Sequence, residues 1–467
     1  MTRVHAFADD ALGELDTVGL VAALAARKVS VVEVVEAAIA RVERVNPALN
    51  AVAYAAFDRA RAEARDPHGG FFAGVPTFVK DNVDVAGMPT QHGTDAFDSP
   101  RKQENGDFAR MYLATGLLPL GKTQLSEFGF SASAEHPRLG PVRNPWHVEH
   151  TAGASSSGSA ALVAAGAVPV AHANDGGGSI RIPAAVNGLV GLKPTRGRLP
   201  QDKLGRQLPV KIVADGVVTR SVRDTAAFLR EAERVYRSLR LPPVGDLTRP
   251  TRSRLKVAVL TQSVTGSTTP EVVEQTHKTA ALLEGLGHHV EPVDSPVPPS
   301  FVEDFTLYWS MLSLLLLRTG RVTFGPTWDL SRVDNLSRGL ARHCATHAHR
   351  LPGAIRRLRR TSADSERFYA TWDVLLSPTL AAATPRLGHL DPTNDFDTVM
   401  GRLTEWVSFT PYQNATGDPA ISLPLARSAD GLPMGMMLAA GAGQEATLLE
   451  LAYALEEAQP WARIQDA

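Results

Sequence analysis

The fold of this chain depends on the stretch Thr151–Pro200, TAGASSSGSAALVAAGAVPVAHANDGGGSIRIPAAVNGLVGLKPTRGRLP. It contains three adjacent serines, Ser155, Ser156 and Ser157, and a further serine, Ser179, behind three glycines. The small residues between these serines predict a helix of about ten residues, which rises about 15 Å. A strand of about five residues then returns about 16 Å. We therefore expect the two serine loops to lie at the same end of the unit and to touch.

The glycines before Ser179 indicate a site for a negatively charged atom. Gly176, Gly177 and Gly178 can adopt backbone angles that a Cβ forbids, and they let a ligand approach the main chain closely. Consecutive N–H groups in such a turn, here those of Gly176 to Ser179, can form an oxyanion hole. Ser179 would then be the nucleophile. The alternative is a tight turn with a surface serine.

A serine nucleophile needs a base, and the sequence offers Lys80. The chain has no Gly-x-Ser-x-Gly elbow, whereas Lys80 ends the apolar, strand-like run in Gly74-Val-Pro-Thr-Phe-Val-Lys-Asp-Asn82. Loss of solvent at the end of such a strand lowers the pKa of a lysine and leaves a neutral amine that can accept a proton. Ser–Lys catalysis is a known variant of the triad. The alternative for Lys80 is a surface charge.

These motifs resemble those of the amidase signature family, serine hydrolases with a Ser–cisSer–Lys triad. The resemblance covers residues 15–220 and 370–460, in family order and spacing. Four more blocks resemble family motifs: Gly121-Lys-Thr123, Arg143-Asn-Pro-Trp146, Gly191-Leu-Lys-Pro-Thr195 and Gly417-Asp-Pro-Ala-Ile-Ser-Leu-Pro424.

The resemblance assigns a role to each matching residue. Lys80 matches the family's lysine, Ser155 its bridging serine with a cis peptide, and Ser179 its nucleophile. Asp175 and Arg181 match residues that support the loop.

The serine loop departs from the family pattern at small residues. Ala154 and Ser157 replace two glycines, and Asn187 stands where many relatives have cysteine. None of these is a triad position, so we expect the loop to keep the conformation that it has in the family. Ser156 is a supporting residue, and we expect Ser156 and Ser157 to cap the following helix.

Alternating strands and helices predict an α/β fold, and the resemblance implies an α/β/α sandwich around a large mixed β-sheet, with a helical insertion. We expect a single domain over residues 1–467. Its catalytic core would be residues 1–220 and 370–467, and residues 221–369 would form a variable region with a largely helical cap over the substrate site. Near the N-terminus, Ser30 and Glu33 form a capping box that starts a helix, and we expect Asn46-Pro47 to end it.

The resemblance implies an amidase that converts a carboxamide to a carboxylate and ammonia or an amine. It implies no metal and no cofactor, a small-molecule amide substrate, and a homodimer. One alternative is the glutaminase subunit of a tRNA-dependent amidotransferase, which typically has Gln where Ile182 follows Arg181. Another is a cyclic-amide or ester hydrolase, because 6-aminohexanoate cyclic dimer hydrolases have similar residues around Asn174-Asp175 and Ile182-Pro183. The third alternative is a non-catalytic binding protein with the same fold.

The net charge and the cysteine content of the chain limit the classes of partner and the cellular compartment that we expect. The net charge of −1 gives no reason to expect nucleic acid, and the arginine-rich stretch 338–367 is interpreted as a solvated helix face. The single cysteine, Cys344, fits a reducing compartment. The N-terminus lacks an apolar signal core, so we expect a cytoplasmic protein. Phe305–Leu317 is apolar but too short to span a bilayer, and we expect a buried helix or a lid rather than membrane docking.

Three other patterns are weaker. Gly116–Thr123 fits the P-loop spacing, but a helix is expected before it and apolar residues fill it. Gly441–Ala446 fits a dinucleotide fingerprint, but no acidic residue follows at the required distance within a βαβ unit. The histidines His343, His347 and His349 have only Cys344 nearby as a further ligand, so we expect no metal there.

Overall fold

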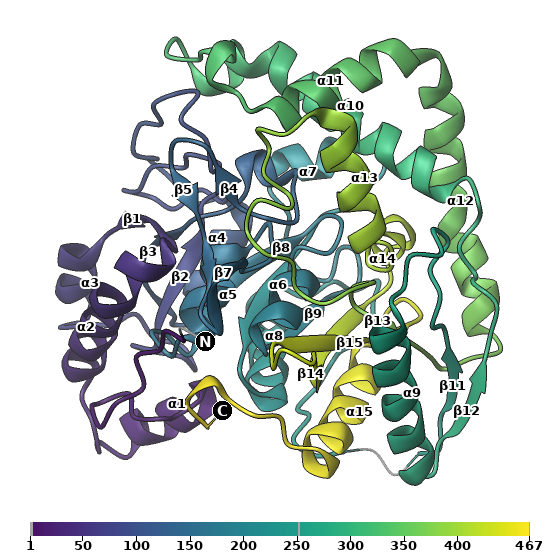
Figure 1. Cartoon of the computed structure of the whole chain (residues 1–467). Helices are drawn as coiled ribbons and strands as arrows, with labels where there is room; N and C mark the ends of the chain where they lie inside the picture. Colours follow the sequence, from purple (N-terminus) through teal and green to yellow (C-terminus); the bar gives the residue numbers. More distant parts are fainter. Residues whose placement is uncertain (1–2, 251–252, 467) are drawn as a thin grey trace.

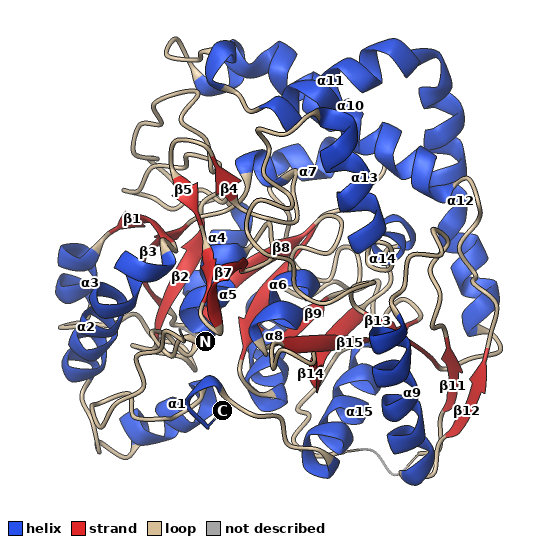
Figure 2. Cartoon of the chain, viewed as in Figure 1, coloured by secondary structure: helices blue, strands red, loops and turns tan. Residues whose placement is uncertain are grey.

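Runs of aliphatic residues form a central sheet of eight strands in a computed structural model of the chain, which describes residues 3–250 and 253–466 (Figure 2). The strand order is β12-β11-β13-β15-β14-β9-β10-β8. Neighbours are parallel among β12, β11 and β13 and antiparallel across the rest, so the sheet is mixed. In sheet order the strands span His289–Pro292, Lys256–Val259, Val374–Pro378, Pro433–Ala440, Ala420–Arg427, Val190–Lys193, Ala214–Thr219 and Val170–Asp175.

Strand β15 shows that helices cover both faces of this sheet. Successive side chains of a strand point to opposite faces. Met436 accepts a hydrogen bond from Thr276 on α9, whereas Met437, on the other face, accepts one from Arg181 at the start of α6. Helix α9 therefore packs on one face and α6 on the other, which gives the expected α/β/α arrangement.

A second sheet brings Lys80 to the edge of the first. Its strands are β1 (Val52–Ala55), β3 (Leu118–Thr123) and β2 (Pro76–Lys80), in the order β1-β3-β2. Strand β2 lies beside β8, where Lys80 N donates to His172 Nδ1 at 3.2 Å. Two short hairpins complete the strands, formed by β4 (Glu135–His136) with β5 (Gly140–Pro141) and β6 (Arg143–Asn144) with β7 (His147–Thr151).

Fifteen α-helices surround the sheets in the described part of the chain, and α10 to α13 gather above the large sheet in Figure 1. The first eight are α1 (Thr17–Ala25), α2 (Val31–Leu49), α3 (Phe57–Glu63), α4 (Asp107–Ala114), α5 (Ser157–Ala164), α6 (Arg181–Asn187), α7 (Lys203–Gln207) and α8 (Val222–Val235). The others are α9 (Pro270–Gly285), α10 (Phe301–Phe324), α11 (Asn335–His347), α12 (Leu351–Tyr369), α13 (Phe396–Trp406), α14 (Pro411–Thr416) and α15 (Glu445–Ala458).

Helix α2 begins as predicted and ends later than predicted. Ser30 and Glu33 form the capping box: Ser30 N donates to Glu33 Oε2 at 2.8 Å, and Glu33 N donates to Ser30 Oγ at 3.3 Å. The prediction that Asn46-Pro47 ends the helix is wrong, because the helix continues through Pro47 to Leu49. Asn46 Oδ1 instead accepts the N–H groups of Ala51 and Val52 and so turns the chain after the last helical turn.

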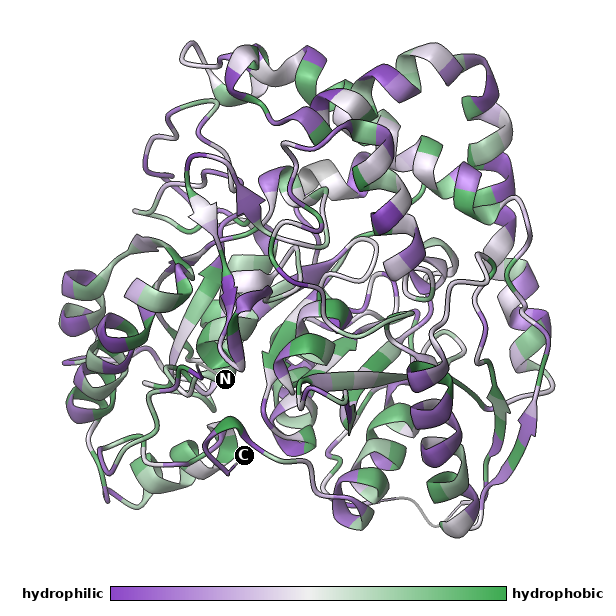
Figure 3. Ribbon diagram, viewed as in Figure 1, coloured by the Kyte–Doolittle hydropathy of each residue, from purple (hydrophilic) through white to green (hydrophobic). Residues whose placement is uncertain are grey.

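Helix α5 is the central helix of the fold. Every residue from Ser157 to Ala164 is buried, which is the pattern of a helix packed on all sides. Figure 3 shows the contrast between a hydrophobic interior and a hydrophilic surface across the molecule: interior elements are green, and purple residues lie on the outward-facing turns of α11 and α12. The serine loop at the start of α5 therefore rests on a rigid base.

Candidate active site

The two serine loops meet, as the sequence predicts. Helix α5 leads away from Ser155 and strand β8 returns to Asp175. Ser156 Oγ joins the loops, because it donates to the carbonyl oxygens of Ser179 at 2.5 Å and Asn174 at 3.2 Å.

These contacts correct one expectation. We expected the hydroxyls of Ser156 and Ser157 to cap α5. Ser156 holds the N-cap position of the helix but its side chain makes no capping hydrogen bond. Its hydroxyl donates instead to carbonyls of the second loop, and the Ser157 hydroxyl donates to the carbonyl of Gly153. The hydroxyls of Ser156 and Ser157 at the N-terminal end of α5 thus donate hydrogen bonds to main-chain carbonyl groups and do not cap the helix.

Lys80 reaches the first serine loop from the end of β2. Its Nζ lies 2.7 Å from Ser155 Oγ and 2.7 Å from Asn174 Oδ1, and its side chain is fully buried. Burial lowers the pKa of Lys80 to about 7, although the carboxylates of Asp215 and Asp175 oppose this shift. A substantial share of the neutral amine is therefore present near pH 7, as expected for a base.

Ser179 lies at the wall of a pocket. It is 7% exposed, and Ala154, which precedes Ser155, lines the same pocket. The Ala154–Ser155 peptide bond is cis. The structure thus brings Lys80 and Ser155 into contact, while among the described residues the Ser179 hydroxyl forms no hydrogen bond with Ser155.

Asp175 and Arg181 hold the glycine loop. Arg181 Nε and Nη2 donate to the Asp175 carboxylate, each at 2.9 Å, and both side chains are fully buried. Burial alone would raise the pKa of Asp175, but the Arg181 charge and its hydrogen bonds lower it below the usual value. Asn414 Nδ2 also donates to Asp175 Oδ1 at 2.9 Å. The loop is therefore supported by a buried ionised pair rather than by solvent.

The N–H group of Gly178, which was predicted to belong to the oxyanion hole, already forms a hydrogen bond within the turn. Gly178 N donates to Asp175 Oδ1 at 2.7 Å, because the carboxylate lies inside the turn. Gly178 also has a φ of +132°, and a Cβ there would lie 2.3 Å from Thr410 Oγ1, so only glycine fits. In the described part of the chain, the N–H groups of Gly176, Gly177 and Ser179 have no hydrogen-bond acceptor, and Gly177 and Ser179 line the pocket.

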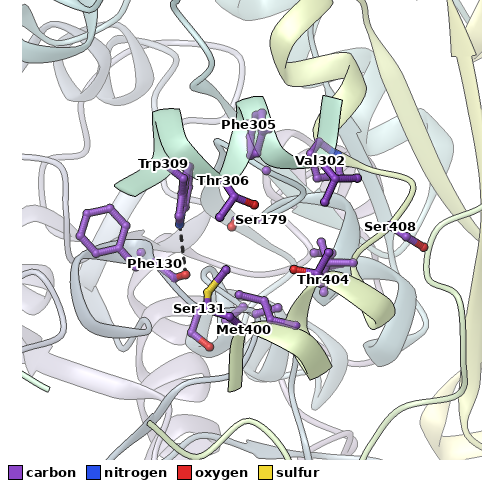
Figure 4. Close-up of a pocket in the computed structure, with 18 of the residues that line it drawn as sticks. Phe130, Ser131, Ser179, Val302, Phe305, Thr306, Trp309, Met400, Thr404 and Ser408 are labelled. Carbon is purple, nitrogen blue, oxygen red and sulfur yellow. Dashed lines mark hydrogen bonds between the residues drawn. The ribbon is translucent and has the colours of Figure 1, made fainter. Parts of the chain in front are cut away.

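The pocket in front of Ser179 encloses about 720 Å³, its open mouth included. Figure 4 shows its two walls, with Phe305 and Trp309 on α10 and Met400 and Thr404 on α13. Helix α10 belongs to the predicted helical region, but α13 follows it in the sequence and was not expected to line the site.

Sequence reasoning missed Asn174 as a partner of Lys80. Its side chain also pairs with Asn82, and each amide donates to the other's oxygen, at 3.0 and 3.3 Å. The sequence signal was available, because Asn174 directly precedes Asp175 and Asn82 lies two residues after Lys80.

The weaker motifs have structural roles. In the P-loop-like stretch, Lys122 is buried and forms an ion pair with Asp81 at 3.0 Å. In the fingerprint-like stretch, Glu445 accepts hydrogen bonds from Thr195 N and from Arg198. The rings of His343 and His347 stack 4.5 Å apart, and among the described residues no group of three or more His, Cys, Asp or Glu could hold a metal. Within the same residues, no helix is long and apolar enough to cross a membrane.

The fold is a mixed α/β one with a buried lysine–serine contact beside a pocket, and comparison with known proteins gives its family. The sequence model of the Amidase family matches residues 33–449. A Mycobacterium bovis protein named "Putative amidase AmiC" is 64% identical over 99% of this chain and 98% of its own length.

A 6-aminohexanoate-cyclic-dimer hydrolase of Paenarthrobacter ureafaciens is 34% identical, with 89% of each chain covered. A solved structure of a 6-aminohexanoate cyclic dimer hydrolase has a TM-score of 0.89 at 32% identity, with 98% of this chain and 99% of that chain covered. The chain therefore belongs to the amidase signature family, and it is an amidase.

Proposed function

We propose that the chain hydrolyses carboxamides through an acyl-enzyme on Ser179, with Lys80 as the base and Ser155 as the proton relay. The main support is the 2.7 Å contact between Lys80 Nζ and Ser155 Oγ, next to the pocket that Ser179 lines. The lowered pKa of Lys80 supports the same role, since a base must be able to hold and release a proton near the working pH.

In the first half-reaction, Ser179 Oγ attacks the carbonyl carbon of the amide. The proton of Ser179 passes to Ser155 Oγ while the proton of Ser155 passes to Lys80 Nζ. The carbonyl oxygen becomes an oxyanion, which the free N–H groups of Gly176, Gly177 and Ser179 stabilise by about 3–4 kcal/mol per donor. Lys80 then returns a proton through Ser155 to the nitrogen. The C–N bond breaks, and ammonia or an amine leaves.

In the second half-reaction, water attacks the acyl-enzyme. The same relay takes a proton from the water and returns it to Ser179 Oγ, and the product leaves as a carboxylic acid that loses its second water-derived proton to the solvent and becomes the carboxylate. Each step uses side chains and main-chain groups of this chain together with water.

The supporting roles follow from the hydrogen bonds. Asp175 and Arg181 fix the turn that presents Ser179, and Ser156 holds the carbonyl of Ser179. Residues 1–220 and 370–467 would form the catalytic core, and α10, in the region 221–369, would cover the substrate.

Labelling of the nucleophile tests this proposal. Purified protein is treated with a fluorophosphonate, which reacts with activated serines, and the modified peptide is sequenced by mass spectrometry. We expect one label on Ser179 and a parallel loss of amide hydrolysis, with no labelling in Lys80→Met. A label on another serine, or amide hydrolysis that continues after Ser179 is fully labelled, would contradict the proposal.

Cyclic-amide hydrolysis is a second candidate, because a relative and a solved structure reported above are both named 6-aminohexanoate cyclic dimer hydrolase. Release of linear dimer from the cyclic dimer, followed by chromatography, tests it. The glutaminase alternative has less support, because Ile182 follows Arg181.

We also propose a cytoplasmic homodimer. The one cysteine, Cys344, is buried as a free thiol, in keeping with a reducing compartment. The dimer rests on the family resemblance alone. Cell fractionation and sedimentation analysis test the two statements separately.

A further inference from the structure

The pocket in front of Ser179 is lined mostly by apolar and aromatic side chains. Among the described residues that line it, none is Asp, Glu, Lys, Arg or His. Its polar side chains are hydroxyls, such as those of Thr306, Thr404 and Ser131. A substrate group in this pocket therefore meets no side chain that could neutralise a charge.

One wall is aromatic and fixed in place. The rings of Phe305 and Trp309 stack with centroids 5.9 Å apart and an interplanar angle of 19°, and Phe130 meets Trp309 edge-on at 5.6 Å. Trp309 Nε1 donates to the carbonyl oxygen of Phe130 at 3.3 Å (Figure 4), so the indole N–H is already used. This wall offers ring faces and edges to a ligand.

The aromatic wall is in contact with the glycine loop. A Cβ added to Gly176 would lie 3.3 Å from the ring of Trp309, and one added to Gly177 would lie 3.7 Å from the ring of Phe305. An acyl group whose carbonyl oxygen reaches the free N–H groups of this loop is therefore directed along Phe305 and Trp309.

The opposite wall is aliphatic. Helix α13 contributes Met400 and Leu403, and Val407 follows at its end. Met400 is unbranched and flexible, so it can adapt to groups of different shape. The pocket is thus a slot between an aromatic wall and an adaptable aliphatic wall.

From this lining we propose that the enzyme selects amides with an uncharged, apolar acyl group, aromatic or branched aliphatic, and rejects acyl groups with a carboxylate or an ammonium group. This rests on the proposed function, since it assigns the pocket to the acyl part of the amide. A primary amide loses only ammonia, so its acyl group is the part large enough to fill the slot. Moving an unpaired charge from water into such a slot costs free energy that no partner returns.

Three benzamides of similar size test the proposal: 4-methylbenzamide, 4-carbamoylbenzoate and 4-(aminomethyl)benzamide. Ammonia release by the wild-type enzyme is measured at pH 8, and kcat/KM is compared. A missing methyl group in an apolar pocket changes kcat/KM by about 10–200-fold, and we expect each charged amide to fall at least about 100-fold below the methyl compound. Values for the charged amides within about threefold of it would overturn the proposal.

Binding separates this proposal from the catalytic one. Ser179→Ala removes the proposed nucleophile and leaves the slot intact, and calorimetry then measures the affinity of each amide without turnover. We expect the methyl compound to bind at least about tenfold more tightly than either charged one. If the wild type hydrolyses no amide but this order of affinity holds, the catalytic proposal fails and the slot assignment stands. Equal affinities would overturn the slot assignment, whatever the activity.

A lysine in the slot provides the converse test. Thr404 is half-buried on α13, and its side chain lines the slot (Figure 4). Thr404→Lys should raise the kcat/KM ratio of 4-carbamoylbenzoate to 4-methylbenzamide at least about tenfold over Thr404→Gln, the neutral control, because a cation then pairs with the carboxylate. An unchanged ratio would contradict the proposal. If Thr404→Lys does not fold, Met400→Lys with Met400→Gln as its control gives the same comparison.

Discussion

Lys80 Nζ lies 2.7 Å from Ser155 Oγ, inside a site where its side chain has no contact with solvent. The amine also lies 2.7 Å from Asn174 Oδ1. Because a neutral amine has one lone pair and two hydrogens, it can donate to Asn174 and direct its lone pair at the Ser155 proton. The hydrogen bond to Asn174 thus orients Lys80 as a base.

The pH dependence of the wild type should report the ionisation of Lys80. Burial places its pKa at about 7, and the protonated form cannot accept a proton. We therefore expect kcat/KM for a neutral amide to rise with pH through about 7 and then to level off. Lys80→Met should be inactive on amides at every pH. Activity of this variant that rises to the wild-type level in alkali would show that hydroxide can replace Lys80 and that the assignment is wrong.

Asn174→Asp should move this pH profile. A carboxylate beside the amine favours the charged form and raises a lysine pKa by about 1–3 units. The rise in kcat/KM should therefore shift to higher pH by a similar amount. Asn174→Ser is the matched neutral control, for which we expect a lower kcat and little shift. If the pH profile of Asn174→Asp coincides with that of the wild type, the proposed effect of residue 174 on the pKa of Lys80 is wrong.

Ser179→Ala should lower kcat on amides by at least about 10⁴-fold, since loss of a nucleophile removes the covalent route. The change deletes one hydroxyl, so the circular dichroism spectrum and the unfolding midpoint should match the wild type. Ammonia release measures the loss. A variant that keeps a tenth of the wild-type rate would show that Ser179 is not the nucleophile.

Arg181→Met should destabilise the fold. It leaves the carboxylate of Asp175 buried without its cation, and breaking a buried pair in this way costs about 3–5 kcal/mol. Urea unfolding at pH 7 measures this cost. Asp175 has a lowered pKa, so its contribution to stability is present at neutral pH and is lost as the pH falls through that lowered value. A change below about 1 kcal/mol at pH 7 would mean that the pair does not support the loop.

The features that the sequence predicted well are local ones. A helix was expected before the P-loop-like stretch Gly116–Thr123, and α4 spans Asp107–Ala114 there. The approach of the two serine loops also followed from local lengths, because one short helix and one short strand separate them.

The features that were missed depend on contacts between distant parts of the chain. Asn174 meets Lys80 across 94 residues, and Thr410 donates to the carbonyl of Gly177 across 233. Helix α13 lines the slot opposite α10, yet nothing in its own sequence distinguishes it from an ordinary surface helix. The Ser156 hydroxyl had a local alternative, the helix cap, but it donates to the carbonyl of Ser179, 23 residues further along the chain.

The proton relay through Ser155 is the central claim, and the ratio of amide to ester hydrolysis tests it most directly. An amine leaves poorly without a proton, whereas a p-nitrophenolate leaves well with none. Ser155→Ala should therefore lower kcat/KM for an amide at least about tenfold more than for the matched p-nitrophenyl ester. Ser156→Ala is the control, since it loosens the loop and should affect both substrates alike. A selective loss on the amide in Ser155→Ala alone is the predicted result, and equal losses on both substrates in Ser155→Ala would contradict the account.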